Sequence, residues 1–188
     1  MLFSQTAMEY YAIQVKTGEE DDFSRRAARV EVLSGRRFFS PRRLVPQHKG
    51  GKTISRLLSV FPGYIFFETG GLKNEERWAI RRVEGFYRFL PSSATPSPLD
   101  DKDRRILLHF ISFGEYADIS EVSFDENDRI VVLEGPLKGL EGNIVKVDKR
   151  RGRAKVALDI CATGFLVDLG FRTVEKLGRG GAEAHEGQ

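Results

Sequence analysis

The sequence predicts an α+β protein with an N-terminal half in which strands and helices alternate and a C-terminal half made of strands alone. Three observations support this prediction. Residues 64–67 form an apolar run after a Pro-Gly turn, which is typical of a buried strand. Apolar residues recur at helical spacing before and after that strand. From Phe124 onward the helical period is absent, and short strands mostly separated by glycine turns remain.

Composition places the chain among globular proteins with a real core but does not identify a partner. Of the 188 residues, 40% are hydrophobic, which is enough for one or two domains. The net charge is only +3, so total charge says little about binding. The single cysteine, Cys161, excludes an internal disulfide, is typical of a reducing compartment, and is expected to be a small buried apolar residue.

We expect no segment that targets the chain elsewhere or crosses a membrane. No apolar run approaches the length of a membrane span, and residues 1–8 lack the basic and apolar regions of a signal peptide. The sequence therefore predicts a cytoplasmic protein with no membrane partner, for which Met1 and Met8 are both candidate starts.

The apolar strand at residues 64–67 carries apolar side chains on both faces. Because side chains alternate along a strand, Tyr64 and Phe66 share one face, and Ile65 and Phe67 share the other. Such a strand is buried between two layers, or it is buried on one side and binds a partner with the other. Both interpretations stay open for Tyr64 and Phe66.

A first strand at residues 10–16 is followed by a predicted helix with a basic outer face. Thr17 and Glu20 have the spacing of a capping box, from which the helix is expected to run to about Leu33. Its apolar stripe consists of Phe23, Ala27, Val30 and Leu33. The basic residues of this helix are Arg25, Arg26 and Arg29. That face either contacts solvent alone or binds nucleic-acid phosphate.

The rest of the N-terminal half predicts more of the same sheet and two further helices. Residues 38–46 form an extended segment whose prolines place it at a sheet edge. The next expected elements are a hairpin tip at 47–52, a strand at 54–58, a short helix at 74–82 around Trp78 and Ile80, and a strand at 85–90. The last helix is expected to begin at Asp100 or Asp101 and to bury Ile106, Phe110 and Phe113.

The C-terminal half is predicted to be a small closed barrel attached by a linker. The linker is placed at residues 114–123, which carry three acids and only scattered apolar residues. Strands are expected at 130–133, 143–148, 154–160 and 165–169. Apolar residues at every second position of 154–160 indicate that one face of this strand is core. A disordered tail is expected at 178–188.

Five motifs together resemble the NusG family of transcription elongation factors. They are Tyr10-Tyr11-Ala12-Ile13-Gln14-Val15, Gly18-Glu19-Glu20, Phe61-Pro62-Gly63-Tyr64, Pro98-Leu99-Asp100-Asp101 and Gly135-Pro136-Leu137-Lys138-Gly139-Leu140-Glu141-Gly142-Asn143-Ile144-Val145. The resemblance implies an N-terminal NGN domain at residues 1–113, with a four-stranded antiparallel sheet flanked by helices. It also implies a C-terminal KOW domain at 124–177, an SH3-like β-barrel that follows the linker.

Residues 148–156 are more basic than a barrel turn needs. This run resembles the LoaP branch of antitermination factors, and that resemblance implies RNA recognition by the KOW domain. The candidate RNA-binding residues are Lys149, Arg150, Arg151, Arg153 and Lys155. Such a cluster binds phosphates strongly without reading base sequence. A solvated hairpin is the alternative interpretation.

The same family resemblance implies RNA polymerase as the main partner. The clamp helices of its largest subunit would dock into an apolar pocket of the NGN domain. The positions that match this pocket are Tyr11, Tyr64, Phe66 and Val83. The positions that match residues facing non-template DNA in RfaH-type paralogues are Lys16, Arg26, Arg29 and Arg81.

We therefore expect a monomeric transcription elongation and antitermination factor that suppresses pausing and termination through its NGN domain and binds nascent RNA through its KOW domain. We expect no catalysis, cofactor or metal, because His48, His109 and His185 lack metal-site spacing. The alternatives are a general NusG or RfaH-type factor that couples polymerase to the ribosome, and a ribosome-associated KOW protein. The concentration of basic charge on the barrel hairpin favours RNA binding.

Overall fold

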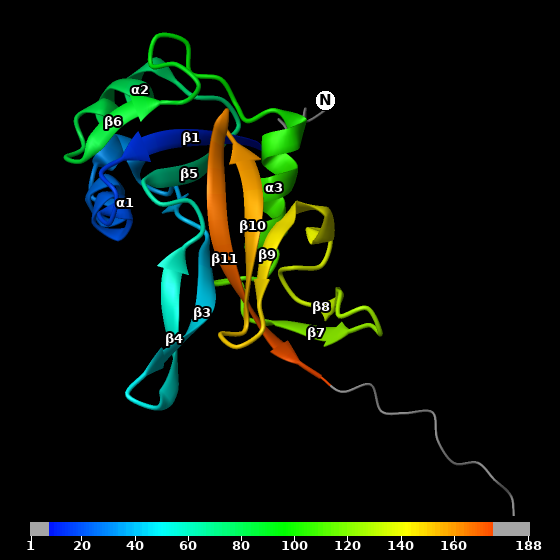
Figure 1. Ribbon diagram of the computed structural model, residues 1–188. Coiled ribbons are helices and arrows are strands. Elements are labelled where there is room, and N and C mark those ends of the chain that lie inside the picture. The colour runs from blue at the N-terminus through cyan, green and yellow to red at the C-terminus, as the bar shows by residue number, and fades with distance from the viewer. Residues whose placement is uncertain (1–7, 175–188) are drawn as a thin grey trace, which may run out of the picture.

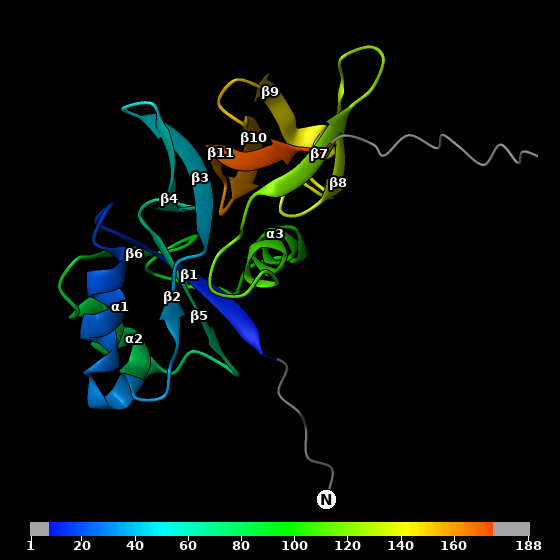
Figure 2. The same cartoon turned by 90° about the horizontal axis from the view of Figure 1, so that it is seen from below.

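The computed structural model describes residues 8–174 and contains two sheets and a separate hairpin (Figures 1 and 2). The four-stranded sheet has the order β2-β5-β1-β6, the five-stranded sheet has the order β8-β7-β11-β10-β9, and β3 and β4 form the hairpin. The predicted α+β class is thereby confirmed. The tail expected at 178–188 lies outside the described residues.

The N-terminal sheet is antiparallel throughout, and β5 lies inside it. Its strands are β1 (Glu9–Val15), β2 (Phe38–Phe39), β5 (Tyr64–Thr69) and β6 (Phe86–Phe89). β5 pairs with β1 on one side and with the short β2 on the other, while β1 also pairs with β6. This is the four-stranded antiparallel sheet that the sequence predicts.

Different parts of the chain cover the two faces of this sheet. The helices are α1 (Glu20–Ala28), α2 (Asn74–Arg81) and α3 (Asp101–Ile111), with a short 3-10 turn, η1 (Glu31–Leu33). α1 and α2 lie on one side of β1 and β5, and α3 lies on the other side with the C-terminal sheet (Figure 2). No helix within residues 8–174 is both long and apolar enough to cross a membrane.

α1 begins and ends differently from the sequence prediction. No side chain caps its N-terminus, so the capping box expected at Thr17 and Glu20 is wrong. Glu20 instead accepts a hydrogen bond at 2.6 Å from the backbone N–H of Gly63. The φ of +81° at Gly63 suits the turn before β5 and is strained for other residues. The helix ends at Ala28, and Leu33 is buried from the separate turn η1.

α2 buries Ile80 as expected, but Glu76 rather than Trp78 is the other buried residue. Trp78 is 59% exposed, whereas Glu76 and Ile80 point inward. Glu76 is tolerated there because Arg36 pairs with its carboxylate at 2.6 Å, and the carboxylate also accepts the backbone N–H of Lys73 at 3.0 Å. A buried ion pair has therefore replaced the aromatic side chain that the sequence favoured as the packing residue.

α3 begins as predicted and ends sooner than predicted. The carboxylate of Asp100 accepts the backbone N–H of Asp103 at 2.8 Å, which satisfies one of the free donors at the helix N-terminus. The fully buried residues of this helix are Leu107 and Phe110. Phe113, expected in the buried stripe, lies beyond the helix and is 38% exposed.

The hairpin of β3 (Arg42–Lys49) and β4 (Lys52–Ser59) stands apart from the four-stranded sheet. Its turn falls within the predicted tip at 47–52. Pro46 is accommodated within β3, as expected near a sheet edge. β3 lies beside β11 of the C-terminal sheet, so the hairpin connects the two halves of the molecule (Figure 1).

The C-terminal sheet, called the barrel below, consists of five strands. They are β7 (Ser120–Phe124), β8 (Ile130–Glu134), β9 (Ile144–Asp148), β10 (Arg153–Ile160) and β11 (Thr163–Thr173), with a 3-10 turn η2 (Glu141–Asn143) before β9. The alternation expected in β10 is confirmed, because every second side chain is buried. Residues 120–123, expected in the linker, belong to β7 because Ser120 and Val122 are fully buried there.

Candidate polymerase and nucleic-acid interfaces

On the aromatic face formed by Tyr64 and Phe66, the barrel covers Tyr64, whereas the ring contacts of Phe66 come from Phe39 and Phe61 of the N-terminal half. Tyr64 is 4% exposed and Phe66 is fully buried. Phe165 of β11 packs edge-on against Tyr64, with ring centroids 5.1 Å apart, and against Phe61 at 5.4 Å. The hydroxyl of Tyr64 also donates a hydrogen bond to Thr163 at 2.9 Å. The face is therefore buried, as the first interpretation predicts. Part of its cover, however, comes from the barrel rather than from the N-terminal half, so this part could be exchanged for a partner.

Polar contacts join α3 to the barrel beside this aromatic contact. The carboxylate of Asp103 accepts the backbone N–H of Cys161 at 2.7 Å. The imidazole Nε2 of His109 lies 2.8 Å from the carbonyl oxygen of Pro136. Burial raises the pKa of Asp103, and burial, assisted by Asp103, raises the pKa of the Cys161 thiol to about 12. The thiol is therefore neutral in this arrangement, although Cys161 is only half-buried.

Two arginines join the β3–β4 hairpin to the barrel. The guanidinium of Arg43 donates through Nε to the carbonyl oxygen of Asp168 at 2.7 Å and through Nη1 to that of Ser59. Burial lowers the pKa of Arg43 to about 10. Arg153 of β10 donates through Nε to the carbonyl oxygen of Pro46 at 2.8 Å. We call the whole contact of the barrel with α3, β3 and the Tyr64 face the domain seam.

The residues matched to the polymerase pocket do not share one surface. Tyr11 lies opposite Phe67 in the β1–β5 register, and its ring stacks on Phe67 at 5.6 Å. Tyr11 and Val83 therefore belong to the core under α1 and α2, on the face away from Tyr64 and Phe66. Directly paired residues of neighbouring strands point to the same side, so the sheet register separates the four residues into two pairs.

Three of the candidate RNA-binding residues line one small pocket on the barrel, with a volume of about 120 Å³. These residues are Arg151, Arg153 and Lys155, and Lys146, Asp148 and Asp168 complete the lining. Lys146, which was not among the predicted RNA-binding residues, lies opposite Lys155 across the β9–β10 pair. Basic residues at alternate positions of β10 indicated a basic face on that strand. Only the strand register shows that Lys146 and Lys155 lie side by side.

The acids of the barrel already pair with part of this basic cluster. Lys155 lies 3.5 Å from Asp168, and Arg151 lies 3.8 Å from Asp148. Lys149 pairs with Asp128, and its ammonium group sits 3.8 Å from the ring centroid of Phe124.

Arg150 is exposed and has no ion-pair partner among residues 8–174. The pocket is lined by four cations and two carboxylates, so its walls carry a net positive charge, and Arg150 adds a free cation on the same turn. Such a surface suits a single phosphate group better than a cation.

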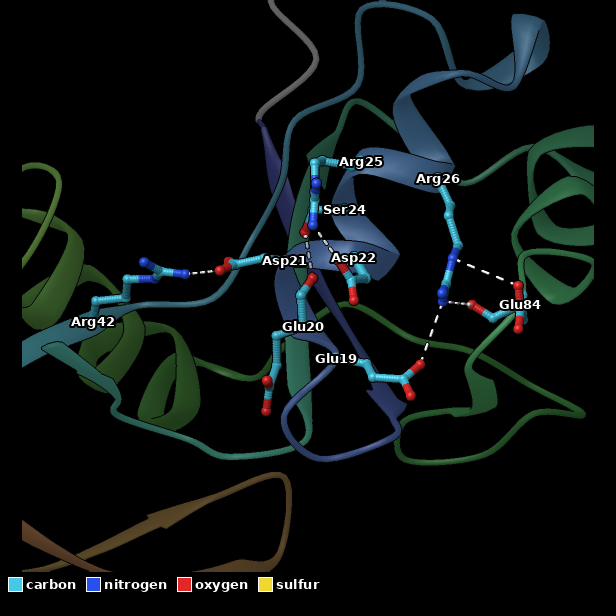
Figure 3. Close-up of polar contacts among 9 residues, drawn as sticks. All are labelled: Glu19, Glu20, Asp21, Asp22, Ser24, Arg25, Arg26, Arg42 and Glu84. Carbon is cyan, nitrogen blue, oxygen red and sulfur yellow. Dashed lines mark hydrogen bonds and ion pairs between the residues drawn. The ribbon is translucent and has the colours of Figure 1, made fainter.

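Glu19, at the start of α1, engages two of the four residues matched to DNA-facing positions, of which Figure 3 shows Arg26. Arg26 lies 3.4 Å from Glu19 and 3.6 Å from Glu84. Lys16 bonds Glu19 at 2.6 Å, and the hydrogen bond from Lys16 is the main cause that lowers the pKa of Glu19. The basic face predicted for α1 is thus largely neutralised by its own first turn.

The other two DNA-facing candidates lie in different surroundings. Arg29 is exposed beyond the end of α1. Arg81 donates to the carbonyl oxygen of Ser93 and lies over the exposed ring of Trp78, 5.3 Å from its centroid. The structure brings Lys16 and Arg26 together at Glu19 and leaves Arg81 on α2. Within the described residues there is no cluster of three or more His, Cys, Asp or Glu side chains placed to hold a metal ion.

Comparison with solved structures finds a similar fold. A solved structure described as "Domain interaction in Thermotoga maritima NusG" is similar, with a TM-score of 0.55 and 21% identity, and the match covers 87% of this chain and 93% of that one. The likeness supports the fold.

Curated relatives match along nearly the whole chain. The Transcription termination/antitermination protein NusG of Vibrio vulnificus is 25% identical over 177 residues, which cover 89% of this chain and 95% of that protein. The protein of the same name from Thermus thermophilus is 26% identical over 182 residues, which cover 90% and 99%. The family model "Transcription termination factor nusG" matches residues 8–108, more than half of the chain. The chain therefore belongs to the NusG family.

Proposed function

We propose that this NusG-type transcription factor binds the clamp helices of the largest RNA polymerase subunit with the face that carries Tyr64 and Phe66, and thereby suppresses pausing and termination. The observation that carries the proposal is the way this face is covered. Its own domain supplies α3 and Phe61, but the ring that packs on Tyr64 comes from the barrel. A cover supplied by another domain can be exchanged for a partner of similar chemistry.

An apolar helix pair is such a partner. Aromatic side chains that line a groove are typical anchors for amphipathic helices, and a few of them contribute most of the binding energy. Polymerase and the barrel then compete for the same face, so only molecules with a displaced barrel bind polymerase. The apparent affinity for polymerase is reduced by the fraction of molecules that are closed.

The barrel is the RNA-binding half in this proposal. The pocket lined by Lys146, Arg151, Arg153 and Lys155 accepts a phosphate of nascent RNA, and the exposed Arg150 extends the contact along the turn. Phosphate contacts of this kind give affinity and position but no base recognition. Because the two functions lie on two domains of one chain, polymerase binding raises the local concentration of the barrel near the transcript.

Several further features belong to the same proposal. The factor works as a cytoplasmic monomer and acts by binding alone, with no cofactor, metal or catalytic step. Non-template DNA is a further partner for the surface of Lys16, Arg26, Arg29 and Arg81, of which Arg29 is exposed and free of acidic neighbours among the described residues. The specialisation toward leader-dependent antitermination, as in the LoaP branch, rests on the basic run at 148–156.

A second candidate function is coupling of polymerase to the ribosome, as in a general NusG or RfaH-type factor. The observation that favours it is that the barrel exposes two apolar side chains, Leu166 at 66% and Val145 at 58%. Side chains of this kind suit a protein partner better than RNA.

Transcription with purified polymerase tests the proposal and separates the two candidates. We expect read-through of terminators to rise with the wild-type chain, and to rise further when the template encodes an RNA leader that the barrel binds. The variant Arg150→Ala/Arg151→Ala should keep the increase in read-through that does not need the leader and lose the further increase that the leader causes. It should also lower the salt slope of RNA binding by about 1.4, from about 0.7 for each lost phosphate contact. An equal response of wild type and variant at every salt concentration would contradict RNA binding by the barrel and favour ribosome coupling.

A further inference from the structure

The basic pocket and the domain seam share Arg153. Its side chain lines the pocket together with Lys146, Arg151 and Lys155. The same guanidinium reaches out of the barrel to β3, where both Nε and Nη2 donate to the carbonyl oxygen of Pro46. One side chain therefore belongs to the candidate RNA site and to the contact that holds the barrel against the N-terminal half.

Asp168 repeats this arrangement from the neighbouring strand β11. Its carboxylate faces the pocket, 3.5 Å from the ammonium group of Lys155. Its backbone carbonyl oxygen accepts Nε of the buried Arg43 on β3, at 2.7 Å. The pocket and the seam are thus two sides of the same short stretch of β10 and β11.

The backbones leave no room between the pocket and the hairpin. A Cβ atom added to Gly170 would lie 2.7 Å from the ring of Pro46, and one added to Gly152 would lie 3.7 Å from it. The hairpin strand therefore packs directly on the turn that carries the basic residues. A ligand that binds the Nε and Nη2 edge of Arg153 must therefore displace the Pro46 carbonyl oxygen from that edge.

The donors that Arg153 uses on Pro46 are those that a phosphate needs. Nε and one Nη form the edge of a guanidinium that binds two phosphate oxygens side by side. A phosphate is charged, whereas a carbonyl oxygen is only polar, so a phosphate adds charge–charge attraction and a bidentate fit that the Pro46 carbonyl lacks. With Lys146, Arg151 and Lys155 beside it, a phosphate in the pocket is the stronger acceptor for Arg153.

We propose that RNA bound in this pocket releases the barrel from the N-terminal half, because RNA phosphate and the Pro46 carbonyl compete for Arg153. The inference rests on the proposed RNA binding and adds its consequence, which is that the transcript uncovers the Tyr64 side of the aromatic face for polymerase. The coupling is reciprocal, so a chain with a weakened seam binds RNA more tightly. RNA recognition and polymerase binding then reinforce each other through one equilibrium between closed and open forms.

Cys161 provides a native reporter of this opening. It is the sole cysteine, and it follows the end of β10 opposite to Arg153. In the closed form its backbone N–H is held by Asp103, and burial suppresses the thiolate. Once the barrel leaves α3, the thiol at this hairpin tip should regain an ordinary pKa of about 8.5 and react faster with an alkylating agent.

The test measures alkylation of Cys161 in the full chain at about pH 8, with and without a labelled single-stranded RNA of about 20 nucleotides at low salt. Fluorescence anisotropy of the same RNA reports binding. We expect saturating RNA to raise the alkylation rate at least about tenfold, because the thiolate fraction rises on opening. In Arg153→Ala and in Arg153→Lys, which keeps the charge but lacks the forked edge, the rate without RNA should already be raised, and RNA should add less than about twofold.

Arg150→Ala is the matched control, since Arg150 is a cation of the same turn with no contact in the seam. This variant should bind RNA more weakly, but its Cys161 should be alkylated at the wild-type rate without RNA. Once RNA saturates the variant, the alkylation rate should rise as much as in wild type. If RNA binds wild type and the alkylation rate stays constant or falls, the release mechanism is wrong, while RNA binding by the barrel stands. If the anisotropy shows no RNA binding at any salt concentration, both this inference and the proposed RNA function are overturned.

Discussion

The two faces of β5 are equally buried, yet they are covered in different ways. Ile65 and Phe67 pack against the helices α1 and α2 of the same domain, which the chain forms close to β5 in sequence. On the other face, Tyr64 packs against β11, about a hundred residues further along the chain, while Phe66 packs against Phe39 and Phe61. Burial alone does not distinguish a permanent core from a joint between domains, and the origin of the covering residues does.

The residues that cover the two faces of β5 also differ in chemistry. Around Phe67 the neighbours are rings, with Tyr11 at 5.6 Å and Phe38 at 5.2 Å. Around Tyr64 the contact is mixed, because its hydroxyl bonds Thr163 and charged side chains such as Asp103 and Arg43 bond barrel backbone nearby. Interfaces between domains are more polar than cores, and each domain can then separate without exposing a wholly apolar surface.

Truncating a side chain on the face of β5 that α1 and α2 cover should cause the largest change, which is a loss of stability. In Phe67→Ala, a fully buried ring is removed from a core that cannot collapse around the gap, so the free energy of unfolding should fall by about 3–5 kcal/mol. Urea unfolding followed by circular dichroism measures this loss. Leu166→Ala, at a site that is 66% exposed, is the control and should change stability by less than about 0.5 kcal/mol. A small loss in Phe67→Ala would mean that the two faces do not differ as described.

Truncating the barrel-covered face should affect polymerase binding more than folding. For Tyr64→Ala with Phe66→Ala we expect polymerase binding to weaken by about 2 kcal/mol or more for each ring, because both rings are anchors of the proposed interface. Binding to purified polymerase and near-native circular dichroism of the variant are the two measurements. If the N-terminal domain unfolds, the rings are core residues of that domain, and if a folded variant binds as well as wild type, this face is not the polymerase site.

Weakening the contact from the barrel side should instead increase the affinity for polymerase. Phe165→Ala removes the edge-on contacts with Tyr64 and Phe61, and each aromatic pair contributes about 0.5–1.5 kcal/mol. The open fraction should rise, so polymerase affinity should increase by about tenfold. Leu166→Ala, on the next residue of β11, should leave the affinity unchanged. An unchanged or weaker affinity in a folded Phe165→Ala chain would show that the barrel does not compete with polymerase.

Local patterns predicted most of the elements that the structure contains. The alternation in β5 and β10, the N-cap at Asp100 and the hairpin turn near residue 50 are set by neighbours within a few positions of the chain, so the sequence displays them. One failure came from a contact that is not local. The capping box expected at Thr17 does not form, because Glu20 instead accepts a hydrogen bond from the backbone N–H of Gly63, which is distant in sequence.

The domain seam could not be predicted, because its contacts join positions far apart in the chain. Arg43 and Asp168 are separated by 125 positions, and Arg153 and Pro46 by 107. Nothing in the basic run at 148–156 indicates that Arg153 also reaches β3. The grouping of Tyr11 with Tyr64 followed family positions, whereas the strand register, which decides the face, was not visible in the sequence.

The smallest expected effect concerns the pH dependence of the seam, which the helix-covered face should lack. Burial raises the pKa of Cys161 to about 12 in the closed form, with Asp103 and Asp100 adding to the shift. In the open form the thiol should titrate near its ordinary value of about 8.5. Below that value the thiol is protonated in both forms, so it does not affect the equilibrium. As the pH rises from there toward 12, only the open form loses the proton, and the closed form is progressively disfavoured.

At pH 9.5 this difference should weaken closure by about 1 kcal/mol, slightly less than the full linkage value because the thiol is not completely buried. The closed fraction can be followed by small-angle X-ray scattering, since the open form has a larger radius of gyration. Cys161→Ala is the control, because it keeps the hairpin tip and its bond to Asp103 but removes the titrating group. The variant should remain closed at pH 9.5 to a greater extent than wild type. Identical pH profiles for the two chains would mean that the thiol is as accessible in the closed form as in the open one, and that the seam does not bury this end of β10.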